Sequence, residues 1–101
     1  MIKIYQIPNE TLRELFENNK FVVVSKILIG LHTPIEYEFS SLYVKVWEGD
    51  IGTDDLEEIF DKFNMDKPEN YNHKSMSSGD IVELQDGKYI CRISSWEKLS
   101  Y

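Results

Sequence analysis

The sequence is poor in the residues that build cross-linked, metal-bound and membrane-spanning proteins. Its one cysteine, Cys91, cannot form an internal disulfide, and its place in the strand-like run KYICRI predicts a buried thiol that acts as a small hydrophobe. The two histidines, His32 and His73, share no zinc-ligand spacing with that cysteine. The longest apolar runs, FVVV and ILIGL, are separated by Ser25 and Lys26. They fall well short of the ~20 residues that a membrane-spanning helix needs.

The beginning of the chain also lacks the features of a secretion signal. The run MIKIYQIPNE carries one early lysine but no long apolar stretch followed by small residues. We therefore expect a cytoplasmic protein. A length of 101 residues, 42% of them hydrophobic, suits a single domain over residues 1–101 with one core.

The first 41 residues are interpreted as a strand, a helix and a second strand. Apolar residues alternate in IKIYQI, and Pro8 ends that run, which predicts a strand over residues 2–7. Asn9 has the character of a helix N-cap, and the helix is expected to stop near Asn18. Residues 21–29 are rich in β-branched side chains and predict a buried strand. Residues 30–41 contain Pro34 and no clear period, so we expect a loop.

A strand and a helix follow in residues 42–64. The run LYVKVWE alternates, which predicts a strand with Leu42, Val44 and Val46 on one face and an outer face that carries Tyr43, Lys45 and Trp47. Thr53 or Asp54 caps the next helix, with Asp54–Glu57 or Asp55–Glu58 at capping-box spacing. Its apolar residues recur at helical spacing, and Asn64 suits the left-handed residue after its end. They are Leu56, Ile59, Phe60 and Phe63.

The last third predicts a β-hairpin. Residues 81–85 and 88–93 are strand-like runs around Asp86-Gly87, a dipeptide that two-residue type I′ turns favour. Trp96 and Leu99 are expected to pack back on the core from a short strand or turn. The predicted fold is α+β, a mostly antiparallel sheet with two short helices on one side, in the order β-α-β-β-α-β-β.

Negative charge is concentrated in one segment. Residues 48–69 hold nine of the eighteen acidic residues but two of the eleven basic ones, so the net charge of −7 arises there and the remaining residues balance. Direct nucleic-acid binding needs clustered lysine and arginine, and the sequence argues against it. The segment instead suits docking on a basic protein surface. The alternatives are a solvated helix face and mimicry of DNA.

The candidate partner-binding residues lie on and beside the predicted acidic helix. Exposed aromatic side chains next to charge are common hot spots of protein interfaces. The set comprises Asp54, Asp55, Glu57, Glu58, Asp61, Trp47 and Tyr71, with Tyr43 as a further exposed aromatic. Self-association into a homodimer by strand-edge pairing is a third possibility, because Trp47 is placed on the outer face.

Little in the sequence points to catalysis or to a cofactor. Asp50, Asp54 and Asp55 lack the spacing of a calcium-binding loop. The loop SMSSGD permits a set of Ser77, His73 and Asp80 on paper, but the chain has no G-x-S-x-G elbow and no phosphate-binding glycine loop. We expect no enzyme, no metal and no cofactor; an enzyme would need Ser77 or Cys91 as its nucleophile. The serines are expected to bond backbone groups of the turn, with Met76 in the core.

One family resemblance rests on the order of several short motifs. The span VWEGDIGTDDLEEIFDKFNMDKPENYNHKSMSSGDIVEL combines an acidic E-G turn, an L-E-x-I-F-x-x-F-N helix, P-x-x-Y and an S-M-S-x-G-D-I-V strand opening. It resembles the YodL-like domain family of Firmicutes and their mobile elements. The resemblance covers roughly residues 42–99, and residues 1–41 match nothing that we can name.

The resemblance implies a protein-interaction role and brings no catalytic residue. Members of the family are small domains, often encoded on conjugative or phage-related elements and sometimes attached to antirestriction domains. One branch is linked to cell shape through the actin-like MreB cytoskeleton. The resemblance therefore implies a module that docks on a protein partner of the host. An anti-defence inhibitor that blocks a nucleic-acid channel and a regulator of MreB are its more specific alternatives.

Overall fold

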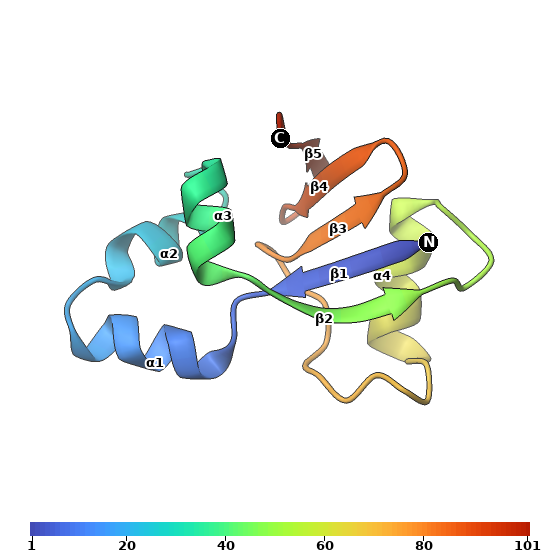
Figure 1. Cartoon of the computed structure of the whole chain (residues 1–101), viewed down its shortest axis with the longest axis horizontal. Helices are drawn as coiled ribbons and strands as arrows, with labels where there is room; N and C mark the ends of the chain where they lie inside the picture. Colours follow the sequence, from blue (N-terminus) through green and yellow to red (C-terminus); the bar gives the residue numbers. More distant parts are fainter.

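The computed structural model describes all residues 1–101 and shows an α+β fold of five strands and four helices (Figure 1). The predicted fold class is confirmed. No helix has the length and the apolar character that crossing a membrane requires. In chain order the elements are β1 (Ile2–Gln6), α1 (Asn9–Glu17), α2 (Phe21–Leu28), α3 (Glu36–Leu42), β2 (Val44–Gly49), α4 (Leu56–Met65), β3 (Ile81–Leu84), β4 (Gly87–Cys91) and β5 (Trp96–Lys98).

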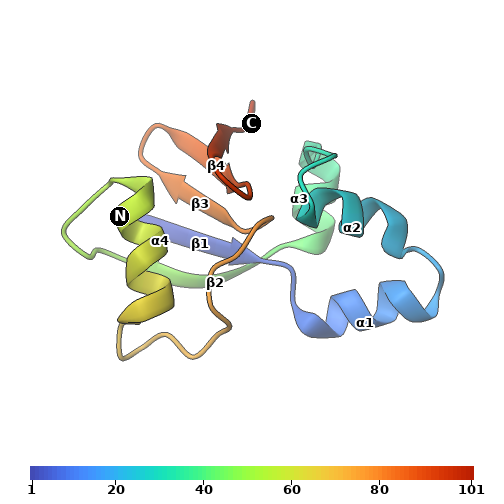
Figure 2. The ribbon, with the colours of Figure 1, turned by 180° about the vertical axis from the view of Figure 1, so that it is seen from behind.

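The five strands form one antiparallel sheet in the order β2-β1-β3-β4-β5. The first strand of the chain is thus an inner strand. Its successive side chains point alternately to the two faces of the sheet and contribute to both. Ile2, Ile4 and Gln6 are buried on the face that α4 covers (Figure 2). Lys3 and Tyr5 point to the opposite face, because successive side chains of a strand alternate. Helix α4 and this sheet face enclose the larger of two hydrophobic clusters.

The other three helices gather at one end of the sheet, where β1 ends and β2 begins (Figure 1). Val24 and Ile27 of α2 join Ile81 and Ile90 of the sheet in a second hydrophobic cluster. Because Ile81 is adjacent in sequence to Val82 of the first cluster, the two clusters lie on opposite sides of β3. The prediction of two short helices on one side of the sheet is therefore wrong, since one helix covers a face and three lie at the end.

Residues 21–29, predicted as a strand, fold as helix α2. Val24 and Ile27 are buried while Val22 and Val23 are exposed, which is the burial pattern of a helix with one covered face. The β-branched side chains lower helix propensity only slightly, and packing against the sheet overrides it.

The predicted loop over residues 30–41 contains helix α3. Glu38 secures its first turn by accepting a hydrogen bond from the backbone nitrogen of Ile35 at 2.9 Å. Phe39 anchors it, since its ring lies 5.0 Å from the ring of Tyr5 and 5.5 Å from that of Tyr43. The first segment is therefore β-α-α-α rather than β-α-β.

The predicted two-face alternation of strand β2 is wrong, because Trp47 packs in the first hydrophobic cluster and Tyr43 in the second. Trp47 and Tyr43 are buried, whereas Val44 is half exposed. The ring of Trp47 packs edge to face on Phe63 of α4 at 5.0 Å. A register shift against β1 falls between Ile4 and Tyr5, so β2 carries one extra residue at that point.

The C-terminal hairpin forms as predicted, but its turn lies one residue earlier. Leu84 pairs with Gly87, so the two turn residues are Gln85 and Asp86 rather than Asp86 and Gly87. Neither turn residue has a positive φ, and the type I′ turn is therefore wrong. Strand β5 confirms the expected short strand that carries Trp96.

Two predicted helix boundaries also differ from the structure. Pro8, not Asn9, occupies the N-cap position of α1. Asn64 lies inside α4, which continues to Met65, and it does not adopt a left-handed conformation.

Candidate functional site

Helix α4 presents an acidic outer face, and its own first turn sets where that face begins. Asp55 is the N-cap, and its Oδ1 accepts a hydrogen bond from the backbone nitrogen of Glu58 at 3.0 Å. Thr53 Oγ1 accepts a hydrogen bond from the backbone nitrogen of Asp55 at 3.0 Å. The predicted N-cap, Thr53 or Asp54, is therefore wrong. Of the two predicted capping pairs only Asp55–Glu58 forms, and only in one direction, since the backbone nitrogen of Asp55 bonds Thr53 instead of Glu58. These contacts satisfy backbone donors that the helix itself leaves free.

The apolar residues of α4 fix its rotation about its own axis. Ile59 and Phe63 are fully buried against the sheet. Helical geometry then turns Glu58 and Asp61 outward, and both are exposed, as are the other predicted acids Asp54, Asp55 and Glu57. The structure therefore brings the five predicted acidic residues together on one exposed surface, which we call the α4 acidic face: Asp54, Asp55, Glu57, Glu58 and Asp61.

Basic groups compensate three of the four other acids of residues 48–69, all but Glu69, and none of the acids of the α4 acidic face. Lys45 pairs with Glu48, the N-terminal ammonium with Asp50 at 3.2 Å, and Lys62 with Asp66 at 3.0 Å. No ion pair involves any of the five residues of the α4 acidic face. Glu57 has one side-chain partner, the indole nitrogen of Trp96, at 3.1 Å. The negative field of the face is thus left unneutralised by the protein.

The predicted exposure of the aromatic residues Tyr43, Trp47 and Tyr71 is wrong. Trp47 is 8% exposed and Tyr71 is 5% exposed, so neither is available as a hot spot on the surface. Their rings each lie 5.0 Å from the ring of Phe63, one on the β2 side and one on the loop after α4. Aromatic pairs in this edge-to-face arrangement stabilise packing beyond their buried area. The two residues hold α4 against the sheet.

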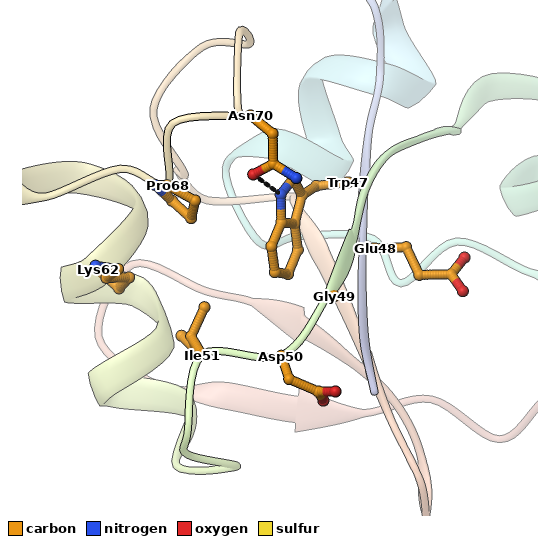
Figure 3. Close-up of a pocket in the computed structure, with 8 residues that line it drawn as sticks. All are labelled: Trp47, Glu48, Gly49, Asp50, Ile51, Lys62, Pro68 and Asn70. Atoms are coloured by element: carbon orange, nitrogen blue, oxygen red, sulfur yellow. Dashed lines mark hydrogen bonds between the residues drawn. The ribbon is translucent and has the colours of Figure 1, made fainter.

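A shallow hollow of ≈ 400 Å³ opens beside Trp47, between the end of β2 and the loop after α4 (Figure 3). Asn70 Oδ1 accepts a hydrogen bond from the indole nitrogen of Trp47 at 3.0 Å and closes one side. Pro68 and Lys62 line the opposite part, while the carboxylate of Glu48 points away from the hollow (Figure 3). The hollow brings together no set of ligands for a metal and no acid–base pair.

The core contains two buried polar residues: sequence reasoning missed Gln6 and considered Asp80 only as a member of a catalytic set on paper. Gln6 is 2% exposed and Asp80 is 3% exposed. The side-chain amide of Gln6 donates to Asp80 Oδ2 at 2.9 Å, and the backbone nitrogen of Ser77 donates to the same oxygen at 2.9 Å. Burial raises the pKa of Asp80 to about 6 despite these hydrogen bonds. A glutamine at a core-facing position of the β1 alternation was the signal available in the sequence.

The loop SMSSGD joins elements that are distant in sequence. Ser78 Oγ donates to the carbonyl of Leu28 at 2.6 Å, and the backbone nitrogen of Gly79 donates to the carbonyl of Cys91 at 2.8 Å. Met76 is buried in the core, as expected. The serines were predicted to bond backbone groups of the turn itself, and for Ser78 this is wrong, because its hydroxyl bonds the end of α2.

The groups proposed on paper for nucleophilic chemistry are not arranged for it. Asp80 accepts hydrogen bonds from Gln6 and from the backbone of Ser77, and no hydrogen bond joins His73 to Ser77 or Asp80. Burial raises the pKa of the Cys91 thiol to about 11, which is the opposite of the depressed pKa that activates a cysteine nucleophile.

Comparison with known proteins gives one match. The family model described as the YodL-like domain matches residues 1–93. Neither a curated protein nor a solved structure matches the chain. The match includes the N-terminal strand and helices α1 to α3, which the sequence resemblance had left out. With nearly the whole chain matched, the protein belongs to the YodL-like domain family.

Proposed function

We propose that the protein is a small, non-enzymatic interaction module that docks on a basic surface of a partner protein through the α4 acidic face. The observation that carries the proposal is the contrast between paired and unpaired acids. The flanking Glu48, Asp50 and Asp66 are paired with cations, and the acids of the face are not. Complementary fields accelerate and orient the encounter of two proteins.

The contacts that hold α4 in place make it suitable as a rigid docking element. Its inner face is fixed by Ile59 and Phe63, and its N-terminus by the Asp55 cap. A helix held in this way loses little conformational freedom when it binds, and interfaces gain affinity from such preorganisation. A solvated helix face without a partner is the outcome against which the proposal is tested, because acids near a helix N-terminus also interact favourably with the helix dipole.

A charge-reversal variant tests the proposal. Glu58→Lys with Asp61→Lys reverses two acids that make no side-chain hydrogen bond or ion pair, so the fold is retained at a cost of about 1 kcal/mol from the helix dipole. The matched control is Glu36→Lys with Glu69→Lys, which makes the same charge change at exposed positions off α4. Each protein is immobilised, exposed to lysate of a bacterium that encodes a family member, and the captured proteins are identified by mass spectrometry.

The expected result is one basic protein that the wild type and the control retain and the α4 variant loses. Binding should weaken with added salt, because exposed charges are screened. Equal retention by all three proteins would contradict the proposal. Added double-stranded DNA distinguishes the alternatives: a partner displaced by DNA from the wild type points to mimicry of nucleic acid, and a partner that stays bound points to a protein-specific surface.

A further inference from the structure

Helices α1 and α2 project from the end of the sheet as a helical hairpin (Figures 1 and 2). Several apolar side chains of this hairpin are exposed. None of the residues of α1 is buried, although Leu12 and Leu15 touch the second hydrophobic cluster. Beyond them, Phe16 is 69% exposed, Val22 61% and Leu31 74%. Single exposed apolar side chains are ordinary, but a group on two consecutive helices marks an interaction surface.

The spacing of the exposed residues on α2 shows that they share a face. Val22, Lys26 and Ile29 recur at helical intervals and are all exposed, whereas Val24 and Ile27 lie on the buried side. Phe16 of α1 lies next to the start of this face, because its ring contacts the ring of Phe21 at 5.9 Å. We call this surface, formed by Phe16, Val22 and Ile29 with Lys26 between the last two, the hairpin apolar face.

The net charge of the hairpin limits which kind of partner can bind the hairpin apolar face. Residues 9–31 carry three acids and three bases, so the segment is neutral while the rest of the chain holds the net charge of −7. A basic partner or a membrane surface with anionic lipids has no electrostatic reason to choose a neutral surface. A second copy of the same chain meets no net repulsion there, and the mixed signs permit a self-complementary contact.

The position of the hairpin also favours a second copy of the chain as the partner that binds it. The hairpin and α4 lie toward opposite ends of the longest dimension of the molecule (Figures 1 and 2). Two copies that meet through their hairpins therefore hold their acidic helices far apart. Two copies that meet through α4 would place unpaired acids of like charge against each other, which costs free energy.

We propose that the hairpin apolar face binds the same face of a second copy, giving a two-fold symmetric homodimer. Standard interfaces bury about 800 Å² on each partner, roughly one eighth of the 6239 Å² surface of this chain. The proposal is independent of the α4 acidic face, and the dimer would display two such faces to a partner.

Sedimentation velocity across a range of concentrations tests the dimer, with two variants of equal charge change. Val22→Glu buries a carboxylate in the proposed interface, and Met65→Glu, at a position 81% exposed on α4, is the control. The wild type and the control should shift from monomer to dimer on the order of 10 µM, and Val22→Glu should need at least about tenfold more protein. Circular dichroism confirms that both variants are folded.

A second measurement needs no variant. Hydrogen exchange of the wild type at low and high concentration should show slower exchange at high concentration within residues 9–31. A monomer up to about 300 µM, far above this affinity range, would overturn the proposal. So would a dimer that Val22→Glu and Met65→Glu leave equally tight, or concentration-dependent protection confined to another surface, such as β2 or α4.

Discussion

The side-chain amide of Gln6 donates a hydrogen bond of 2.9 Å to the carboxylate of Asp80, and both residues are almost completely buried. The bond joins the first strand of the chain to the residue that precedes β3. It also places an ionisable carboxyl group in an apolar surrounding, which makes the stability of the fold depend on pH.

We expect the ionisation of Asp80 to lower the free energy of unfolding as the pH rises. Its pKa is raised from 3.8 to about 6, so the folded state holds the proton more tightly than the unfolded state. The resulting contribution is fully present below pH 4 and is lost as the pH rises through about 6, amounting to about 3 kcal/mol. Urea unfolding of the wild type and of Asp80→Asn at pH 4 and pH 7 measures the difference.

In Asp80→Asn this part of the pH dependence should be absent, because the amide does not titrate. The lowered pKa values of Glu38 and Glu48 act in the opposite direction but are common to both proteins and cancel in the comparison. Parallel pH profiles for the two proteins would contradict the assignment.

Gly79 should tolerate no side chain. Its φ is +95°, and a Cβ atom would lie 2.7 Å from Leu28 Cδ2 and 3.4 Å from Leu28 Cα. Gly79→Ala should therefore cost the strain of a left-handed backbone plus a steric clash, together about 3 kcal/mol. The midpoint of denaturant unfolding reports the loss.

Gly52 is the matched control for Gly79. It has a similar φ of +86°, but nothing lies within 4 Å of the position of its Cβ. Gly52→Ala should therefore cost about 1 kcal/mol, the backbone term alone. Equal losses for the two variants would show that α2 does not press on the loop SMSSGD.

Substitutions of Asp54 and of Asp55 should change the free energy of unfolding by different amounts, although the two residues are adjacent, exposed and of equal charge. Asp55 caps α4, whereas Asp54 makes no side-chain hydrogen bond. Asp55→Ala should cost about 1 kcal/mol of unfolding free energy and Asp54→Ala less than about 0.5. Thermal unfolding at pH 7 compares them, and the reverse order would place the cap at Asp54.

Trp47 and Val44 test how burial varies along β2. Trp47→Ala removes a ring that packs on Phe63 and should cost about 3–5 kcal/mol. Val44→Ala, at a position 50% exposed, should cost less than about 1 kcal/mol. Similar losses at both sites, measured by urea unfolding, would speak against the observed register.

Elements whose signal is local could be predicted from the sequence. Helix α4 has a strict apolar period and a capping residue, and the hairpin of β3 and β4 has two strand-like runs around a short turn. Helix α2 could not, because its run FVVV satisfies a buried strand and a half-buried helix equally well. Contacts with Ile81 and Ile90, about 60 residues later in the chain, decide between them.

The exposed acidic residues of the candidate site could be predicted from the sequence, but the burial of its aromatic residues could not. A carboxylate without a partner stays in water wherever the helix lies, so the exposure of Glu58 and Asp61 follows from the apolar positions of α4 alone. Strict alternation in β2 would place Trp47 and Val44 on opposite faces. The register shift instead puts both on the face of Ile4 and Gln6, and this depends on the pairing of β2 with β1 rather than on β2 itself.

The two tryptophans flank α4 in different surroundings, so the intrinsic tryptophan fluorescence of the protein reports on this helix. Trp47 is buried against Phe63, while the partly exposed Trp96 packs on Phe60 at 6.5 Å and donates to the carboxylate of Glu57. A ligand on the α4 acidic face would change the emission of Trp96 and leave that of Trp47 unchanged, whereas detachment of the helix would change both. Docking and local unfolding can thus be distinguished in solution without a label.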